Sequence, residues 1–241
     1  MYGPEIYGMV FSIKTESCGY GDDGYDAYIR LEARENGALL VGKQTKRDCT
    51  GTIRRRFKVA FDWALQLRQR LREMKVPVYP DIVMGCDGEF TELRIGGYEG
   101  GAKYRWWSAA PEGWEDLDEF ALGVRALFDT LCKLADERAG ALPELLWTCP
   151  IAGMRYAEGA EAAVKGMESG ARLELRREND NRHDGNAIAV MAGDVRIGYV
   201  PRACNADMAA WLDRGRQCEA RAIVREDEYG APYLTLAIFS G

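Results

Sequence analysis

The residues best suited to chemistry gather in one polar stretch between two apolar runs. Residues 176–186 read Arg-Arg-Glu-Asn-Asp-Asn-Arg-His-Asp-Gly-Asn. The asparagines and aspartates can accept hydrogen bonds from their own backbone, so we expect a tight loop between two strands. Its arginines are suited to holding phosphate groups, and its carboxylates can accept hydrogen bonds from hydroxyl groups. A turn that serves structure alone is the alternative interpretation of the same residues.

Histidine and cysteine content excludes several kinds of catalytic site. His183 is the only histidine of the chain, which excludes zinc enzymes with several histidine ligands and HNH-type nucleases. The seven cysteines are widely spaced, and no two have the spacing of a zinc knuckle. We therefore expect reduced structural thiols, no metal site and no cofactor.

Two short motifs come close to catalytic patterns, and each lacks a necessary residue. Residues 37–43, Gly-Ala-Leu-Leu-Val-Gly-Lys, match the start of a phosphate-binding loop, but Gln44 replaces the Ser or Thr that would bind magnesium. The run also lies in an expected strand, whose amides would pair in a sheet. Asp81, Glu92 and Arg94 loosely match a metal-dependent nuclease, with arginine where a lysine is needed. A nuclease remains the less favoured alternative.

Composition indicates a globular protein, and its charge is uneven. The chain has 241 residues, 47% hydrophobic residues and a net charge of −6, which suits one large or two small domains. Its first residues lack the pattern of a signal peptide, and no apolar run is long enough to span a bilayer. We expect a cytoplasmic protein with no membrane partner. Residues 43–75 carry 11 basic and 3 acidic side chains, which can contact phosphate or pair with the acidic segment that follows.

The first part of the chain predicts an antiparallel sheet with two helices. Two alternating runs flank Asn36-Gly37, which is a strong hairpin signal. Helical spacing predicts an arginine-rich helix from Arg54 to Met74 that could extend a DNA path, and a second helix from about Asp116 to Ala139. Further strands are expected around Phe90–Ile95 and Lys103–Ser108. Adjacent tryptophans on a strand point to opposite faces, so we expect one of Trp106 and Trp107 in the core and one at its rim.

The last part is richer in short strands. We expect one helix, from about Cys204 to Asp213, stopped by Gly215. The strands are predicted at 172–177, 187–191, 196–200, 217–224 and 233–239. Short strands with one or two helices in about 95 residues are typical of a small barrel of the OB-like or SH3-like type.

The segment from Leu173 to Val190, followed by Gly-Tyr-Val-Pro-Arg at 198–202, resembles the HIRAN domain. Upstream, Ile151-Ala-Gly-Met-Arg-Tyr156 also fits the resemblance, which covers about Cys149 to Gly241. HIRAN domains occur at the N-terminus of eukaryotic SNF2-type DNA-remodelling ATPases and in many short bacterial proteins. The resemblance implies an OB-like β-barrel that captures the 3′ end of single-stranded DNA.

The resemblance also implies roles for particular residues. Arg155 and Tyr156 match a pair that contacts phosphate and base. His183 matches an aromatic residue that packs on the terminal nucleotide, and Asp184 matches the acceptor of the 3′-hydroxyl hydrogen bond. The other matching or neighbouring residues are two aromatics and three auxiliary phosphate contacts: Tyr199, Phe239, Arg176, Arg177 and Arg182. His183 and Tyr199 depart from the family pattern, which has tyrosine and histidine there.

These inferences give an α+β protein with two domains. We expect an α+β domain of unknown function at 1–140, a linker at 141–148 and a HIRAN-like domain at 149–241. The expected function is binding of single-stranded DNA at 3′ ends without an ATPase, and we do not expect an enzyme. The main alternative is a protein-interaction module, with a protein partner bound through the first domain.

Overall fold

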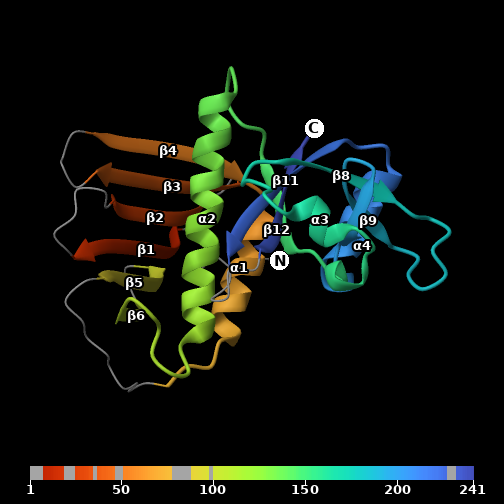
Figure 1. Ribbon diagram of the computed structural model, residues 1–241. Helices are drawn as coiled ribbons and strands as arrows, with labels where there is room; N and C mark the ends of the chain where they lie inside the picture. The colour runs from red at the N-terminus through yellow and green to blue at the C-terminus, as the bar shows by residue number, and fades with distance from the viewer. Residues whose placement is uncertain are drawn as a thin grey trace. The chain divides into compact units, whose positions relative to one another are not determined.

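The computed structural model describes residues 8–18, 25–34, 37–46, 51–77, 88–97, 100–226 and 232–241. The chain divides into two compact units, Met1–Cys132 and Lys133–Gly241, and each is described by itself (Figure 1). Within the described ranges no helix is both long and apolar enough to cross a membrane. The predicted α+β class is confirmed, with a large sheet and four α-helices among the described residues.

Unit 1 is built on an antiparallel sheet in the order β4-β3-β2-β1-β5-β6. Each strand pairs with its neighbour in antiparallel register, for example Ile29 opposite Gly42 and Phe11 opposite Ile95. Side chains alternate between the two faces of such a sheet. The strands are β1 (Gly8–Cys18), β2 (Tyr25–Arg34), β3 (Gly37–Lys46), β4 (Thr52–Val59), β5 (Gly88–Gly97) and β6 (Gly100–Trp107).

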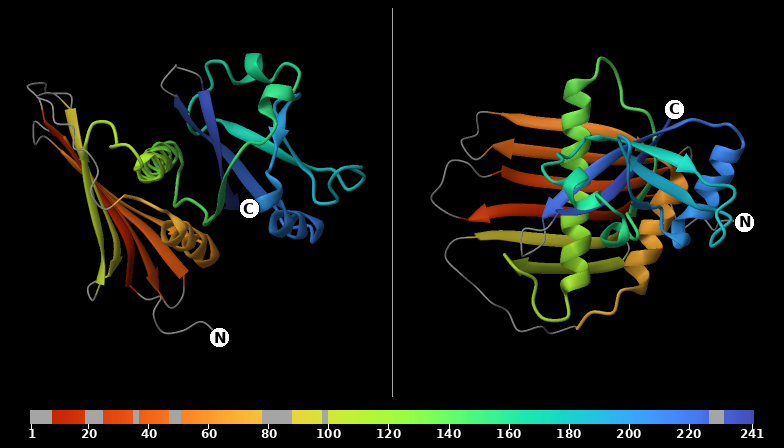
Figure 2. Two further views of the ribbon diagram at one scale, coloured as in Figure 1. Left: turned by 90° about the horizontal axis from the view of Figure 1, so that it is seen from below. Right: turned by 45° about the vertical axis from the view of Figure 1, so that its right-hand side comes forward.

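Two helices cover one face of this sheet, as the left view of Figure 2 shows. They are α1 (Phe61–Glu73) and α2 (Glu115–Glu137). The ring of Phe120 on α2 meets Phe11 of β1 edge to face, with centroids 5.0 Å apart. Apolar side chains of β1 to β4 point to this face, among them Ile13, Ile29 and Leu40, each at most 2% exposed. The core of unit 1 therefore lies between the sheet and the helices.

The structure corrects two predictions for this part. The segment 52–59 is strand β4, so Arg54 and Arg56 lie on the sheet and the helix begins only at Phe61. Trp107 is not at the rim of the core. It is 8% exposed and packs edge to face on Phe90, while Trp106 on the other face is 2% exposed. The adjacent tryptophans are both buried and offer no stacking platform for bases.

The run that resembles a phosphate-binding loop is part of β3, as predicted. Gly37 to Lys43 pair with β2 on one side, and most of the run also pairs with β4 on the other. A Cβ atom added at Gly42 would lie 2.1 Å from the ring of Phe128, so the glycine allows the helix to pack closely on the strand. This run is a structural part of the sheet.

Unit 2 holds a second antiparallel run of strands in the order β10-β9-β8-β11-β12-β7. One isolated bridge joins Ala152, just after β7, to Tyr199 of β10. The paired ladders leave the sheet open, so the predicted closed barrel is not established. The strands are β7 (Leu145–Pro150), β8 (Arg172–Arg177), β9 (Ile188–Ala192), β10 (Val195–Tyr199), β11 (Cys218–Glu226) and β12 (Pro232–Ser240).

Two helices and one short 3-10 turn complete unit 2. They are α3 (Ala160–Val164), α4 (Arg202–Asp213) and the turn η2 (Met154–Tyr156). The predicted helix thus begins two residues earlier than expected, and Gly215 follows it with φ of 72°. Buried side chains from all of the strands and from both helices form one core, including Cys149, Ile188, Val190, Met208 and Ile238.

Candidate nucleic-acid interface

The predicted polar loop joins β8 to β9 and is held by its own side chains. The backbone amide of Glu178 donates to the carbonyl of Ala187 at 3.0 Å, which closes the base of the loop. Asn181 Oδ1 accepts from the amides of His183 and Asp184 at 3.0 and 3.2 Å. These contacts are the side-chain turns expected from asparagine in this pattern. They fix the backbone that carries the His183-Asp184 pair.

Asp184 is the anchor of this loop. Its Oδ1 accepts from the amide of Asn186 at 2.9 Å, and its Oδ2 accepts from Asn205 Nδ2 at 2.8 Å. Arg202 Nε lies 3.5 Å from the same Oδ2. The Asn186 and Asn205 hydrogen bonds hold the pKa of the Asp184 carboxyl below its usual value, with the Arg202 charge as a smaller cause. A carboxylate has about four acceptor positions, so these bonds leave capacity for a further donor.

Two residues in the first turn of α4 form hydrogen bonds with the loop. Arg202 Nη2 donates to the carbonyl of His183 at 2.6 Å, and Asn205 is 2% exposed where it meets Asp184. Sequence reasoning missed both residues, because their partners lie 19 and 21 positions earlier. The Pro201-Arg202 pair at the start of the helix is part of the resemblance, and it was the available signal for Arg202.

The three auxiliary arginines differ in their surroundings. Arg177 donates to the carbonyls of Ala187 and Gly185 at 3.1 and 2.7 Å and pairs with Asp213 at 3.0 Å. It therefore holds the loop in place. Arg176 is exposed, with Glu174 at 3.3 Å, and Arg182 lies exposed on the loop itself. These two guanidinium groups are open to a phosphate.

Tyr199 connects the loop to the segment that carries Arg155 and Tyr156. Its hydroxyl donates to Glu178 Oε2 at 3.2 Å and accepts from Arg196 Nη1 at 2.8 Å. Burial raises the pKa of the Tyr199 hydroxyl, and the charge of Glu178 acts in the same direction. The backbone of Tyr199 exchanges two hydrogen bonds, of 2.8 and 2.9 Å, with Ala152.

Arg155 and Tyr156 form the end of the 3-10 turn η2, and both are exposed. Tyr156 is 84% exposed, more than any other large apolar side chain in the described ranges. The Arg155 guanidinium lies 6.0 Å from the centre of its ring. A tyrosine with this exposure buries almost none of its apolar ring within the fold. The ring is available to stack on a planar ligand, with a cation beside it.

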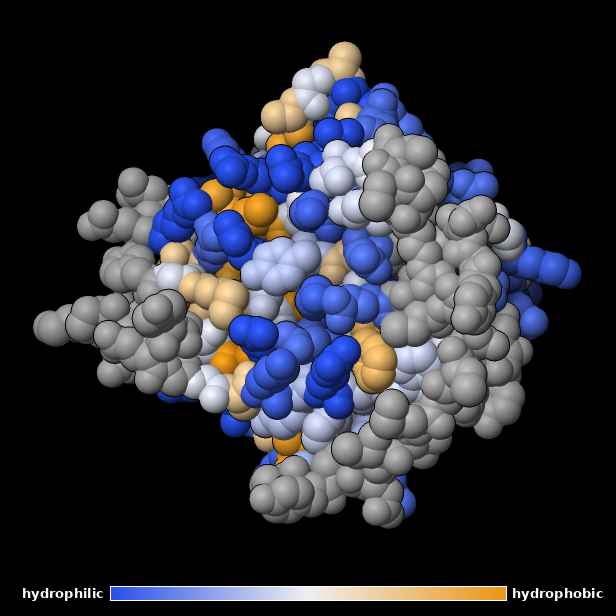
Figure 3. Space-filling model, turned by 90° about the vertical axis from the view of Figure 1, so that its left-hand side faces the viewer, coloured by the Kyte–Doolittle hydropathy of each residue, from blue (hydrophilic) through white to orange (hydrophobic). Residues whose placement is uncertain are grey.

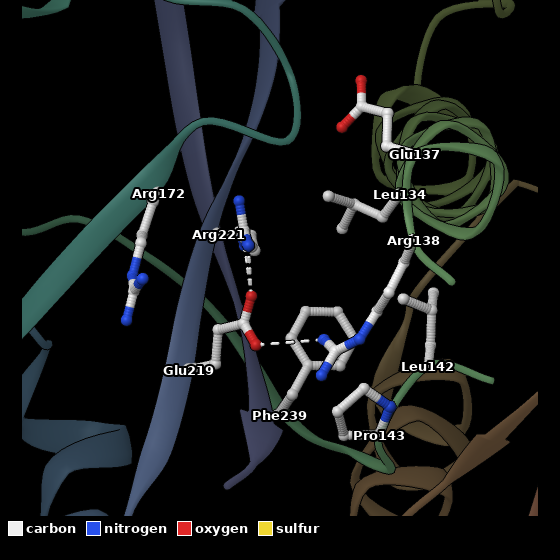
Figure 4. Close-up of a pocket in the computed structure, with 9 residues that line it drawn as sticks. All are labelled: Leu134, Glu137, Arg138, Leu142, Pro143, Arg172, Glu219, Arg221 and Phe239. Carbon is white, nitrogen blue, oxygen red and sulfur yellow. Dashed lines mark hydrogen bonds and ion pairs between the residues drawn. The ribbon is translucent and has the colours of Figure 1, made fainter. Parts of the chain in front are cut away.

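Phe239 does not lie in an open position. The side chain is 2% exposed and belongs to the wall of a pocket of ≈ 360 Å³ (Figure 4). In β12 it pairs with Glu219 of β11, whose Oε2 lies 3.3 Å from Arg138 Nη1. Neighbouring residues Leu236 and Ile238 belong to the core cluster, and Phe239 does not. Its ring has no exposed face for a base in this structure.

Of the residues of the nuclease alternative, the structure describes Glu92 and Arg94. Asp81 lies outside the described ranges, and the carboxylate of Glu92 pairs with Arg94 at 2.7 Å and with Lys103 at 2.8 Å. In the same ranges no group of three or more His, Cys, Asp or Glu side chains is placed to hold a metal ion.

A strand-rich unit with a rigid polar loop, flanking arginines and an exposed aromatic ring has the form of a small ligand-binding module. Residues 147–236 match the family model of the HIRAN domain, so unit 2 contains a HIRAN domain. The HIRAN domain is in general a DNA-binding module. A search of curated proteins found no match.

Two solved structures are each similar to a part of the chain. A protein from Lactobacillus plantarum is 27% identical, over 40% of this chain and 92% of that one, with a TM-score of 0.36. The HIRAN domain of human HLTF is 21% identical, over 39% of this chain and 73% of that one, with a TM-score of 0.32.

Proposed function

We propose that the HIRAN domain of this protein binds single-stranded DNA at its 3′ end, without an ATPase of its own. The observation that carries the proposal is one connected set of hydrogen bonds. It runs from Asp184 through Asn181 and Glu178 to Tyr199, and on to the backbone of Ala152. The loop and the segment with Arg155 and Tyr156 are therefore both held on β10.

Each of the side chains in this site has a role in binding that matches its chemistry. The ring of Tyr156 stacks on a base, and Arg155 holds the adjacent phosphate. Asp184 accepts a hydrogen bond from the terminal 3′-hydroxyl, and His183 packs on the last nucleotide. A strand that continued past this point would bring a phosphate against the Asp184 carboxylate. Repulsion between these charges selects for an end.

Binding by Tyr156 is tested with a matched control. Tyr233 is also exposed, at 42%, and also has an arginine beside it, Arg225 at 5.0 Å from the ring centre. We expect Tyr156→Ala to weaken binding of a short single strand about tenfold, since base stacking contributes roughly 1–3 kcal/mol. Tyr233→Ala should bind as the wild type does. Fluorescence anisotropy with an end-labelled strand measures both.

Two outcomes would count against the proposal. Equal losses in the two tyrosine variants would show that Tyr156 has no special place in binding. Failure of the wild type to bind any single strand at low salt would favour the protein-interaction module. Circular dichroism of both variants checks that the fold is retained.

A further inference from the structure

The face of the unit 1 sheet that α1 and α2 leave uncovered carries a strong excess of positive charge. Alternation along the strands places ten basic side chains of the described residues on this face, and four acidic ones. The basic residues are Lys14, Arg30, Arg34, Lys43, Arg54, Arg56, Lys58, Arg94, Lys103 and Arg105, and the acidic residues are Glu16, Asp26, Glu32 and Glu92. We call these residues the basic sheet face.

The placement follows from strand register. Lys14 lies opposite Tyr28 of β2 and Glu92 of β5, while its neighbour Ile13 is buried toward the helices. On β4, Phe57 and Val59 are buried, so Arg54, Arg56 and Lys58 point the other way. Figure 3 shows the side of unit 1 from which this face is seen, and hydrophilic side chains gather there around small apolar spots.

Three carboxylates of the face are each shared by two cations. Glu32 pairs with Arg30 and Arg34, both at 2.7 Å, and the hydrogen bond from Arg34 is the main cause that lowers the pKa of Glu32. Glu92 is shared in the same way by Arg94 and Lys103. Glu16 is shared by Lys14 and Arg105. Sharing leaves part of the positive charge of each group uncompensated.

A second group of cations on this face has no ion pair within the described part of the chain. It consists of Lys43, Arg54, Arg56 and Lys58, all exposed. Lys43 lies directly opposite Arg54 in the β3–β4 ladder. Like charges in this arrangement destabilise a sheet. Repulsion between these cations therefore lowers the stability of the sheet, and a bound polyanion would remove it. The face is positive although the net charge of the whole chain is −6.

We propose that the basic sheet face is a second nucleic-acid site, which binds the phosphate backbone of a single strand away from its ends. A flat field of cations matches a chain of phosphates, and binding would release the counterions of the strand. The inference concerns a different unit from the HIRAN domain and a different part of the ligand. It also departs from the predicted basic helix, because Arg54 and Arg56 lie on β4 and not on a helix.

The test uses a short closed circle of single-stranded DNA, which has no end for the HIRAN domain to capture. We expect the wild type to bind the circle, with an affinity that falls steeply between about 50 and 200 mM salt. Arg54→Glu/Arg56→Glu should weaken binding about tenfold or more. Loss of two phosphate contacts should also make the slope of log affinity against log salt shallower by about 1.4.

A matched variant controls for net charge. Arg72→Glu/Lys75→Glu makes the same change in charge at exposed positions on α1 and just after it, and should leave binding of the circle nearly unchanged. If the first variant fails to fold, Lys43→Glu/Lys58→Glu changes the same face and has the same expected result.

Three results would overturn the inference. The first is that the wild type does not bind the circle at low salt. The second is that both charge variants lose affinity for the circle equally. The third is that the protein binds phosphatidylserine vesicles but not the circle, and that Arg54→Glu/Arg56→Glu reduces binding to the vesicles. That result would make the basic sheet face a membrane-contacting surface. If the circle fails to bind while linear strands still bind by their 3′ ends, only this inference fails, and the proposed function stands.

Discussion

Asp184 is the residue on which the candidate interface depends. Its carboxylate accepts hydrogen bonds from Asn186 and Asn205 and lies near Arg202. The same carboxylate is the group proposed to accept the 3′-hydroxyl, so structure and recognition depend on one side chain. The turn-forming role and the binding role therefore belong to the same side chain, and a ligand-dependent measurement distinguishes them.

A thiol near this residue gives a prediction that depends on pH. A hydrogen bond with Cys149 lowers the pKa of Cys204 on α4 to about 7, although burial opposes the shift. The same contact and burial raise the pKa of Cys149. Cys204 should therefore ionise at lower pH than an ordinary thiol, and its alkylation by iodoacetamide should begin at lower pH than that of Cys218. Mass spectrometry of the labelled peptides measures the rate at each pH.

Cys218 serves as the internal control for this experiment. It is also half-buried, but burial alone raises its pKa, so it should react only at higher pH. Cys149→Ala removes the hydrogen-bond partner and should move the Cys204 midpoint upward. Identical pH profiles for Cys204 and Cys218 in the wild type would contradict the prediction.

The sequence predicted some site residues and not others, for a physical reason. The turn around His183 and Asp184 is local, since Asn181 and Asn186 bind backbone or side-chain atoms within three positions. The contact of Asn205 with Asp184 depends on how α4 packs, which no local pattern reveals. Phe239 was chosen by its place in the motif, and its burial depends on residues distant in the sequence.

At the scale of elements, the spacing of apolar residues predicted a helix correctly where one period is strong. It predicted an element wrongly where the helix and strand periods overlap. α2 keeps one apolar face over many turns, and the structure places it at Glu115–Glu137. In β4 the buried residues Phe57 and Val59 alternate, but Phe57 also stands four residues before Phe61. This spacing imitates a helix, and it led to the wrong start for α1. Strand β1 was missed, and the expected linker at 141–148 overlaps the first part of β7 (Leu145–Pro150).

The attachment of β10 to the segment after β7 gives a prediction about stability. A Cβ atom added at Gly198, where φ is 155°, would lie 2.5 Å from Ile151 Cγ2 and 2.6 Å from the carbonyl oxygen of Ala152. A backbone oxygen cannot move away easily, so Gly198→Ala should lower the free energy of unfolding by about 1–3 kcal/mol. Urea unfolding followed by circular dichroism measures the change.

The control for this substitution lies in the same unit. A Cβ atom at Gly185 meets no heavy atom within 4 Å, so Gly185→Ala should change stability much less. If Gly198→Ala were as stable as the wild type, the close approach of these two segments would not hold in solution.

At the scale of the whole molecule, the chain combines a HIRAN domain with a unit whose sheet presents a basic face. Neither feature follows from the net charge, which is −6, because positive charge is concentrated by strand register. The HIRAN domain was predicted because its loop and its Gly-Tyr-Val-Pro-Arg segment are contiguous motifs. The basic sheet face was not, because it brings together residues from six strands.

The central claim is that the HIRAN domain selects a free 3′-hydroxyl. The most direct measurement compares two single strands of one sequence, ending in a 3′-hydroxyl or a 3′-phosphate, by fluorescence anisotropy. We predict that the wild type prefers the hydroxyl end by about tenfold or more, since a phosphate would meet the Asp184 charge. Asp184→Asn, which removes that charge, should lose the preference. Equal affinity of the wild type for the two ends would contradict the claim.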